Sequence, residues 1–140
     1  MVLPMEVGKS PTLKGIRGML AIKDIKKGEL LEKCPVIVMT AKQEKSVDET
    51  SLVKYTYEWT GTDIALVLGY GSLYNHSFQP NADYRKDIKN ENMVFRAIKD
   101  IKQGEEIFIS YKFDPNSKKP FFKLYTDYDA HRKESKKSNR

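Results

Sequence analysis

A nine-residue segment that occurs twice constrains the fold of this chain most strongly. Residues 21–29 read AIKDIKKGE and residues 97–105 read AIKDIKQGE. In each copy isoleucines alternate with polar residues until a glycine supplies a turn signal. An apolar run rich in strand-forming residues follows each copy, LLEKCPVIVM after the first and EIFISYKF after the second. Each half of the chain is therefore predicted to turn at its glycine and to enter a strand. Two copies are too few for a solenoid, and the alternative is two hairpin-like units that use the same turn chemistry.

The rest of the pattern predicts a mostly β domain with little helix. Residues 64–68 form a compact apolar run, residues 93–97 read as a strand, and Gly, Pro and Asn turns separate such segments. Residues 41–59 are polar without a clear period, which leaves one helix or a long loop open. A length of 140 residues fits one domain. The predicted parts are an N-terminal lead-in (1–12), the domain (13–113) and a C-terminal segment with a basic tail (114–140).

The formal charge of +6 is unevenly distributed. Residues 1–115 hold 17 Lys and Arg against 16 Asp and Glu, whereas residues 116–140 hold 8 against 3. A nucleic-acid-binding domain concentrates basic residues on the fold itself, so the nearly neutral body argues against direct sequence-specific nucleic-acid binding. The basic tail is expected to be a solvated end, and the alternative is recruitment to an anionic partner.

Several classes of protein are disfavoured by what the chain carries. Its apolar runs are far shorter than the roughly 18 residues of a membrane span, and its start does not have the order of a signal peptide. Cys34 is the single cysteine, which excludes a disulfide within the chain and suits a reducing compartment. His76 and His131 are the only histidines, and no ligand spacing suggests zinc. We therefore expect an intracellular protein with no metal site and no membrane contact.

Three clusters of residues are candidates for chemistry. Residues 14–21 (KGIRGMLA) carry glycines that let a backbone approach a ligand, but they lack the third glycine of a dinucleotide fingerprint. Residues 74–81 (YNHSFQPN) place hydrogen-bonding side chains beside an apolar run, which indicates either a tight turn network or a polar ligand. A hydrolase built on Ser77 and His76 is disfavoured, because adjacent residues of an extended chain point apart. The third cluster is residues 104–111 (GEEIFISY), which end a predicted strand at Tyr111. By itself this tyrosine would be a core or rim aromatic.

Taken together, the three clusters resemble the SET-domain lysine methyltransferases. That family carries N-H-S-x-x-P-N and, later, G-E-E/D-x-x-x-x-Y, which match residues 75–81 and 104–111 here. Its first glycine segment usually reads G-x-G, whereas this chain has Ile16 at the first of those positions. The resemblance covers about residues 13–113 and is nearest to the short viral and bacterial SET proteins without zinc-binding flanks.

The resemblance implies a fold and a set of site residues. The fold is one of several small antiparallel sheets, with the N-H-S segment threaded beside the last strand like a pseudoknot. Tyr111 is expected at the point of methyl transfer. Residues expected to bind S-adenosylmethionine are Ile16, Arg17, Gly18, Tyr74, Asn75 and His76. Residues expected to line the substrate lysine channel are Tyr70, Tyr84 and Ile109. An aromatic after the last strand is expected to close the adenine site, with Phe113, Phe121, Phe122 and Tyr125 as candidates.

The expected function is methylation of a lysine side chain of a protein, with histone tails as the family's commonest substrates. The alternative is an inactive SET-like module that binds a peptide, and the presence of Asn75, His76 and Tyr111 argues against it. Tyr84 matches a channel tyrosine that restricts the number of methyl groups added, whereas Ile109 carries no hydroxyl that would do so. Pairing of two copies and a nuclear or cytoplasmic location, depending on the host, both stay open.

Overall fold

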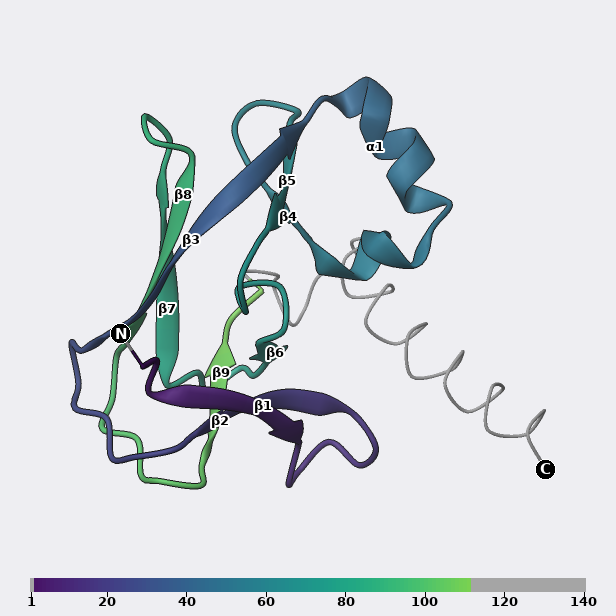
Figure 1. Cartoon of the computed structure of the whole chain (residues 1–140). Helices are drawn as coiled ribbons and strands as arrows, with labels where there is room; N and C mark the ends of the chain where they lie inside the picture. Colours follow the sequence, from purple (N-terminus) through teal and green to yellow (C-terminus); the bar gives the residue numbers. More distant parts are fainter. Residues whose placement is uncertain (1, 112–140) are drawn as a thin grey trace, which may run out of the picture.

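The computed structural model describes residues 2–111 as two β-sheets that lie one above the other in Figure 1. The lower sheet has the order β1-β2-β9-β6 and the upper sheet the order β4-β5-β3-β8-β7. The strands of the lower sheet are β1 (Met5–Lys9), β2 (Arg17–Ala21), β9 (Glu106–Ile109) and β6 (Asn75–His76). Those of the upper sheet are β4 (Thr56–Glu58), β5 (Ile64–Val67), β3 (Leu30–Met39), β8 (Asn92–Ala97) and β7 (Ala82–Asp87). The prediction of a mostly β fold of several small sheets is confirmed.

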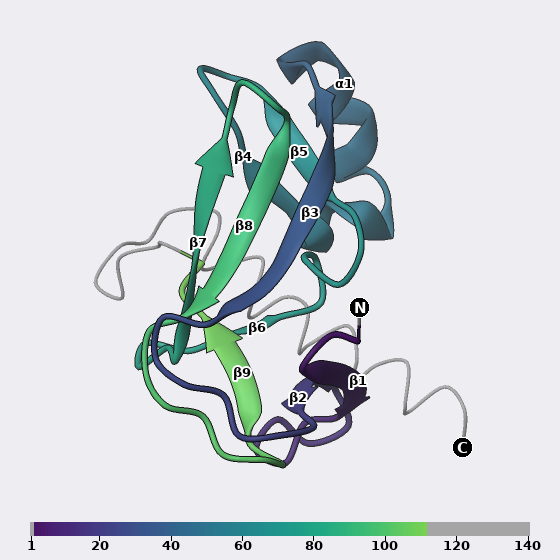
Figure 2. The same cartoon turned by 60° about the vertical axis from the view of Figure 1, so that its left-hand side comes forward.

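The two copies of the repeat are the crossovers between these sheets. Residues 22–29 run from β2 up to β3, and residues 98–105 run from β8 back down to β9 (Figure 2). They lie antiparallel, and Ile25 and Ile101 exchange both backbone hydrogen bonds at 2.7 and 2.8 Å. Gly28 donates to the carbonyl of Ala97, and at the equivalent position Gly104 donates to that of Ala21, both at 2.8 Å. Both glycines have φ of +89°, as the predicted turns require.

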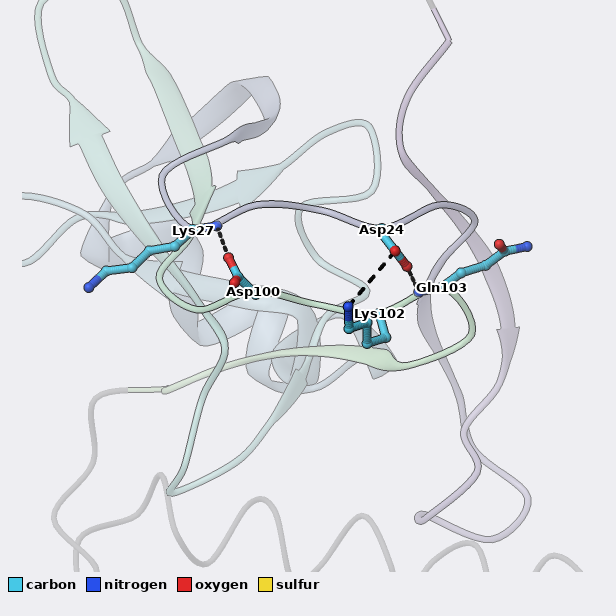
Figure 3. A network of polar contacts seen from close by, with 5 residues as sticks. All are labelled: Asp24, Lys27, Asp100, Lys102 and Gln103. Carbon is cyan, nitrogen blue, oxygen red and sulfur yellow. Dashed lines mark hydrogen bonds and ion pairs between the residues drawn. The ribbon is translucent and has the colours of Figure 1, made fainter.

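Two aspartates complete this reciprocal contact (Figure 3). Asp100 accepts a hydrogen bond from the backbone N–H of Lys27 at 2.8 Å, and Asp24 accepts one from that of Gln103 at 2.9 Å. Lys102 adds an exposed ion pair to Asp24, with a nitrogen–oxygen distance of 4.0 Å. Each copy of the repeat thus binds the turn of the other copy, and we refer to residues 21–29 and 97–105 together as the paired crossovers.

The hydrophobic core is built from buried side chains of the crossovers and of both sheets. Ile25 and Ile101 are 1% exposed, so the contact between the crossovers is itself part of the core. Strand alternation supplies the remaining inward side chains, as in β8, where Met93, Phe95 and Ala97 are buried and the residues between them are not. Burial of this kind is the main stabilising contribution to a domain of this size.

Two regions carry more structure than their patterns indicated. Residues 41–59 form α1 (Ala41–Asp48), a 3₁₀ helix η1 (Ser51–Tyr55) and β4. A capping box begins α1, with the Thr40 hydroxyl accepting from the Gln43 backbone and the Gln43 side chain accepting from the Thr40 N–H. The lead-in contributes β1, which pairs with β2 along its whole length.

We predict that Asp24→Ala and Asp100→Ala each lower the free energy of unfolding by about 1 kcal/mol, because each leaves a backbone N–H of the opposite turn without its acceptor. Urea unfolding followed by circular dichroism measures the change. Asp24→Asn and Asp100→Asn are the matched controls, since an amide oxygen can still accept the bond. Equal losses in the Ala and Asn variants would mean that charge, rather than the hydrogen bond, holds the turns.

Candidate active site

The pairing of β6 with β9 brings the second and third sequence clusters together. The two strands are parallel, with Asn75 opposite Phe108 and His76 opposite Ile109. The chain extends this contact through the Ser77 N–H, which donates to the Ile109 carbonyl at 3.0 Å. The resemblance placed the N-H-S segment beside the last strand, and it lies there.

Asn81, the last residue of the N-H-S-x-x-P-N pattern, forms side-chain hydrogen bonds with the backbone of β9. Its side-chain amide donates to the Glu106 carbonyl at 2.9 Å, and its side-chain oxygen accepts from the Phe108 N–H at 2.8 Å. Its own carbonyl accepts from the N–H of Ile98 at 2.9 Å. One side chain therefore satisfies a donor and an acceptor of β9, and the pattern's final asparagine has a structural role.

His76 is buried against β9 and holds the chain at Tyr111. Its Nδ1 accepts a hydrogen bond from the Tyr111 backbone N–H at 2.9 Å. Its ring packs edge-on against Phe78 at 4.5 Å and tilted against Tyr111 at 5.2 Å between centroids. Burial lowers the pKa of His76 below its ordinary value of 6.5. The imidazole is therefore neutral near pH 7, the form in which Nδ1 can accept this bond.

The Tyr111 hydroxyl is held as firmly as its backbone. It donates to the carbonyl of Tyr74 at 2.6 Å. The Tyr74 ring is only 1% exposed and stacks on Phe95 at 4.7 Å, so Tyr74 reaches the candidate site through its backbone carbonyl. Tyr111 is thus fixed between His76 and Tyr74, both from the second sequence cluster.

Two further tyrosines, Tyr57 and Tyr84, pack against each other, and Tyr57 interacts electrostatically with Tyr111. The Tyr57 hydroxyl donates to the Gly71 carbonyl at 2.6 Å, and its ring meets that of Tyr84 edge-on at 5.1 Å. Burial, followed by the neighbouring tyrosines Tyr111, Tyr84 and Tyr74, raises the pKa of Tyr57 well above its ordinary value. Burial, with Asp83 and Glu58, raises the pKa of Tyr84 to about 12. These hydroxyls stay protonated at neutral pH and can act as donors.

Tyr57 was not among the residues predicted from the sequence. The aromatic alternation at positions 55, 57 and 59 was its only sequence signal, because one face of a strand collects every second residue.

The glycine segment meets the same strands through a buried carboxylate. The Asn75 side-chain amide donates to the Arg17 carbonyl at 3.0 Å and to Oε2 of Glu106 at 2.7 Å. The hydroxyl of Ser10 donates to the other Glu106 oxygen. Gly18 is buried, and a Cβ there would overlap both the Glu106 carboxylate and the Asn75 amide. Glu106 and Ser10 were not predicted as site residues, although Glu106 lies within the G-E-E pattern.

The remaining predicted residues are placed less directly. Ile16 is buried and Arg17 exposed at the start of β2, next to Gly18. Tyr70 is half-buried, whereas Ile109 is fully buried in the core, so their place in a channel stays a prediction. The candidates for closing the adenine site lie outside the described residues: Phe113, Phe121, Phe122 and Tyr125.

Within residues 2–111 there is no cluster of three His, Cys, Asp or Glu that could hold a metal ion. No helix in this range has the length and apolar character to cross a membrane.

Comparison with known proteins places residues 16–112 in a match to the model of the SET domain family. A curated Schizosaccharomyces pombe protein, the histone-lysine N-methyltransferase specific for H3 lysine-37, is 34% identical over 109 residues, which span 77% of this chain and 73% of that protein. A crystal structure of a Plasmodium falciparum protein described as a histone methyltransferase is 33% identical with a TM-score of 0.64, covering 84% of this chain and 100% of that one.

A more distant likeness concerns the fold alone. The Chaetomium thermophilum polycomb repressive complex 2, in an autoinhibited conformation bound to S-adenosylmethionine, has a chain that matches with a TM-score of 0.67 at 22% identity. The match covers 91% of this chain and 17% of that one.

We predict that Gly18→Ala destabilises the fold and separates Asn75 from Glu106, because the added Cβ overlaps both side chains. Gly8→Ala is the matched control: Gly8 is the partner of Gly18 across β1 and β2, and a Cβ there meets only the flexible end of Leu20. Thermal unfolding should show a drop of several degrees for Gly18→Ala, which corresponds to about 1–3 kcal/mol for overpacking, and a smaller one for Gly8→Ala. Equal drops would show that the close packing at Gly18 is not special to the site.

Proposed function

This chain belongs to the SET-domain family, and we propose that it is an enzyme that transfers the methyl group of S-adenosylmethionine to the lysine side chain of a protein substrate. One observation supports the assignment of the active site to the surroundings of Tyr111. Tyr111 is held at its backbone by His76 and at its hydroxyl by the Tyr74 carbonyl, and Tyr57, whose ring packs on that of Tyr84, interacts with it electrostatically. An aromatic group so tightly oriented at the end of β9 is suited to positioning a reacting amine.

The residues beside Asn75 fit the cofactor. S-adenosylmethionine, when bound, supplies a methyl group on a positively charged sulfur. The Glu106 carboxylate is buried next to Asn75 and Gly18, which favours a cationic ligand nearby. Phe78 leaves 53% of its surface exposed while it packs on His76, which offers an apolar face to an aromatic base. We assign cofactor binding to Ile16, Arg17, Gly18, Tyr74, Asn75 and His76.

The chemistry requires a lysine amine that is neutral, close and aligned. Positioning of two reactants can supply about 7–11 kcal/mol of the barrier. The hydroxyls of Tyr57 and Tyr84 remain uncharged, so they can orient the amine without competing as charged groups. Burial and a nearby positive charge lower the pKa of a lysine from its ordinary value of about 10.4. A strong general base is therefore not needed at this site.

We propose a histone as the substrate, because the relative from S. pombe acts on lysine-37 of histone H3. The basic excess of residues 116–140 suits association with nucleic-acid-bound substrates, rather than sequence-specific binding to nucleic acid. A nuclear location follows if the substrate is chromatin. Pairing of two copies to complete a substrate groove remains part of the proposal. An inactive peptide-binding module is the second candidate, but the intact arrangement around Tyr111 disfavours it.

We predict that the chain binds S-adenosylmethionine and methylates histone H3, and that Tyr111→Phe loses at least about 100-fold in turnover, as expected when an oriented polar group is removed from the transition state. Cofactor binding by calorimetry and the thermal unfolding midpoint should change little, because the ring still packs on His76. Labelled cofactor with recombinant histones measures the turnover. Tyr111→Phe at the wild-type rate would place the site elsewhere, and no cofactor binding at millimolar concentration would overturn the enzyme assignment.

We predict that Tyr84 limits the number of methyl groups added, since its hydroxyl would hold the amine or a water where a further methyl group must fit. The wild-type enzyme should give mainly mono- and dimethyl-lysine, and Tyr84→Phe should shift the product toward trimethyl-lysine. Mass spectrometry of a methylated peptide over time measures the ratio. Tyr57→Phe is the comparison, because it removes a hydroxyl already bonded to Gly71. Trimethyl-lysine as the main early wild-type product would contradict a guarding role for Tyr84.

A further inference from the structure

One short loop supplies the acceptors for both oriented tyrosines. The Tyr111 hydroxyl donates to the carbonyl of Tyr74 and the Tyr57 hydroxyl to that of Gly71, each at 2.6 Å. Residues 69–74, which we call the acceptor loop, join β5 to β6. A shift of this loop would therefore move two hydroxyls of the candidate active site together. The position of these hydroxyls depends on whatever fixes the acceptor loop.

Glu32 of β3 contacts the acceptor loop through its carboxylate. Its Oε2 accepts a hydrogen bond from the Tyr70 N–H at 3.1 Å. The loop also lies close to the carboxylate at Gly69, where φ is +62° and an added Cβ would overlap Oε2. At the far end of the loop, burial and then the Glu32 charge raise the pKa of the Tyr74 hydroxyl. Glu32 thus acts on the residues before and after Gly71.

A β-bulge in β3 is what directs Glu32 inward. The register with β8 shifts between Leu30 and Glu32, and as a result both Leu31 and Glu32 are buried where strand alternation would expose one of them. Glu32 is 9% exposed and forms no ion pair within residues 2–111. Burying a carboxylate without a cation is costly, and a hydrophobic residue would serve the core better. The backbone is therefore shaped to bring a carboxylate to the acceptor loop, at a cost that packing alone does not explain.

We propose that Glu32 is a positioning residue for methyl transfer, which holds the acceptor loop so that the Tyr74 and Gly71 carbonyls orient the hydroxyls of Tyr111 and Tyr57. Glu32 does not touch substrate or cofactor in this role and acts only through the loop. The inference rests on the proposed function.

A double-mutant cycle between Glu32→Ala and Tyr111→Phe tests this role. With the full chain, labelled S-adenosylmethionine and recombinant histone H3, Glu32→Ala should lower kcat by about 10-fold or more while the dissociation constant of the cofactor changes by less than about 2-fold. Once the Tyr111 hydroxyl is absent, the same change should cost only about 2-fold, because only the part of its effect that passes through the Tyr57 hydroxyl remains. Glu32→Gln keeps an acceptor for the Tyr70 N–H and should recover most of the loss. A parallel cycle with Tyr57→Phe provides a second background if turnover with Tyr111→Phe is too slow to measure.

Leu31→Ala is the matched control, since the same bulge buries Leu31 but no hydrogen bond links its side chain to the acceptor loop. It should lower the unfolding midpoint and show no coupling to Tyr111→Phe, with all variants assayed where circular dichroism shows them folded. An equal loss from Glu32→Ala in both backgrounds, or a loss matched by Leu31→Ala, would reduce Glu32 to a stabilising residue. Wild-type protein that neither binds cofactor nor forms product would instead overturn the proposed function.

Discussion

The antiparallel contact of the paired crossovers is the constraint on which the rest of the structure depends. Each crossover carries the chain from one sheet to the other, and the Ile25–Ile101 pairing with its flanking glycine and aspartate contacts holds the two at one register. With this register, β9 pairs with β2 in one sheet and β3 pairs with β8 in the other. Because β9 is placed by the contact, the site for β6 exists only after both halves have met.

The candidate site is assembled from polar groups that are buried and bonded to one another. The Glu106 carboxylate accepts hydrogen bonds from Ser10 and Asn75, and His76 accepts one from the Tyr111 backbone N–H. The Asn81 side chain donates one to the backbone of β9. A buried polar group is tolerated when its partners are in place and is costly when one is missing. Orientation at the site is therefore coupled to the pairing of β6 with β9, and a change at one member is expected to disturb the others.

The motifs identified candidate site residues but not the residues that support them. Asn75, His76 and Tyr111 could be named as candidates through the resemblance of their motifs to the SET family, and the structure brings His76 and Tyr111 into contact. Each motif is a short segment, so its residue types can be read locally, but only the parallel pairing of β6 with β9 brings His76 to Tyr111, 35 positions later. Ser10 and Tyr57 were missed because no pattern links them to the motifs, and their contacts span 96 and 14 positions of the chain.

The sequence by itself determined the turns, the strands that follow them and the residues able to do chemistry, because glycine conformation, strand alternation and side-chain type are local properties. Only the tertiary structure decided that the two repeats contact each other, that β6 lies parallel to β9, and that Glu32 turns inward through a bulge. Each of these depends on which segments meet across long sequence separations. That choice follows from the joint burial of two sheets and from the pairing of buried polar groups, neither of which any single segment contains.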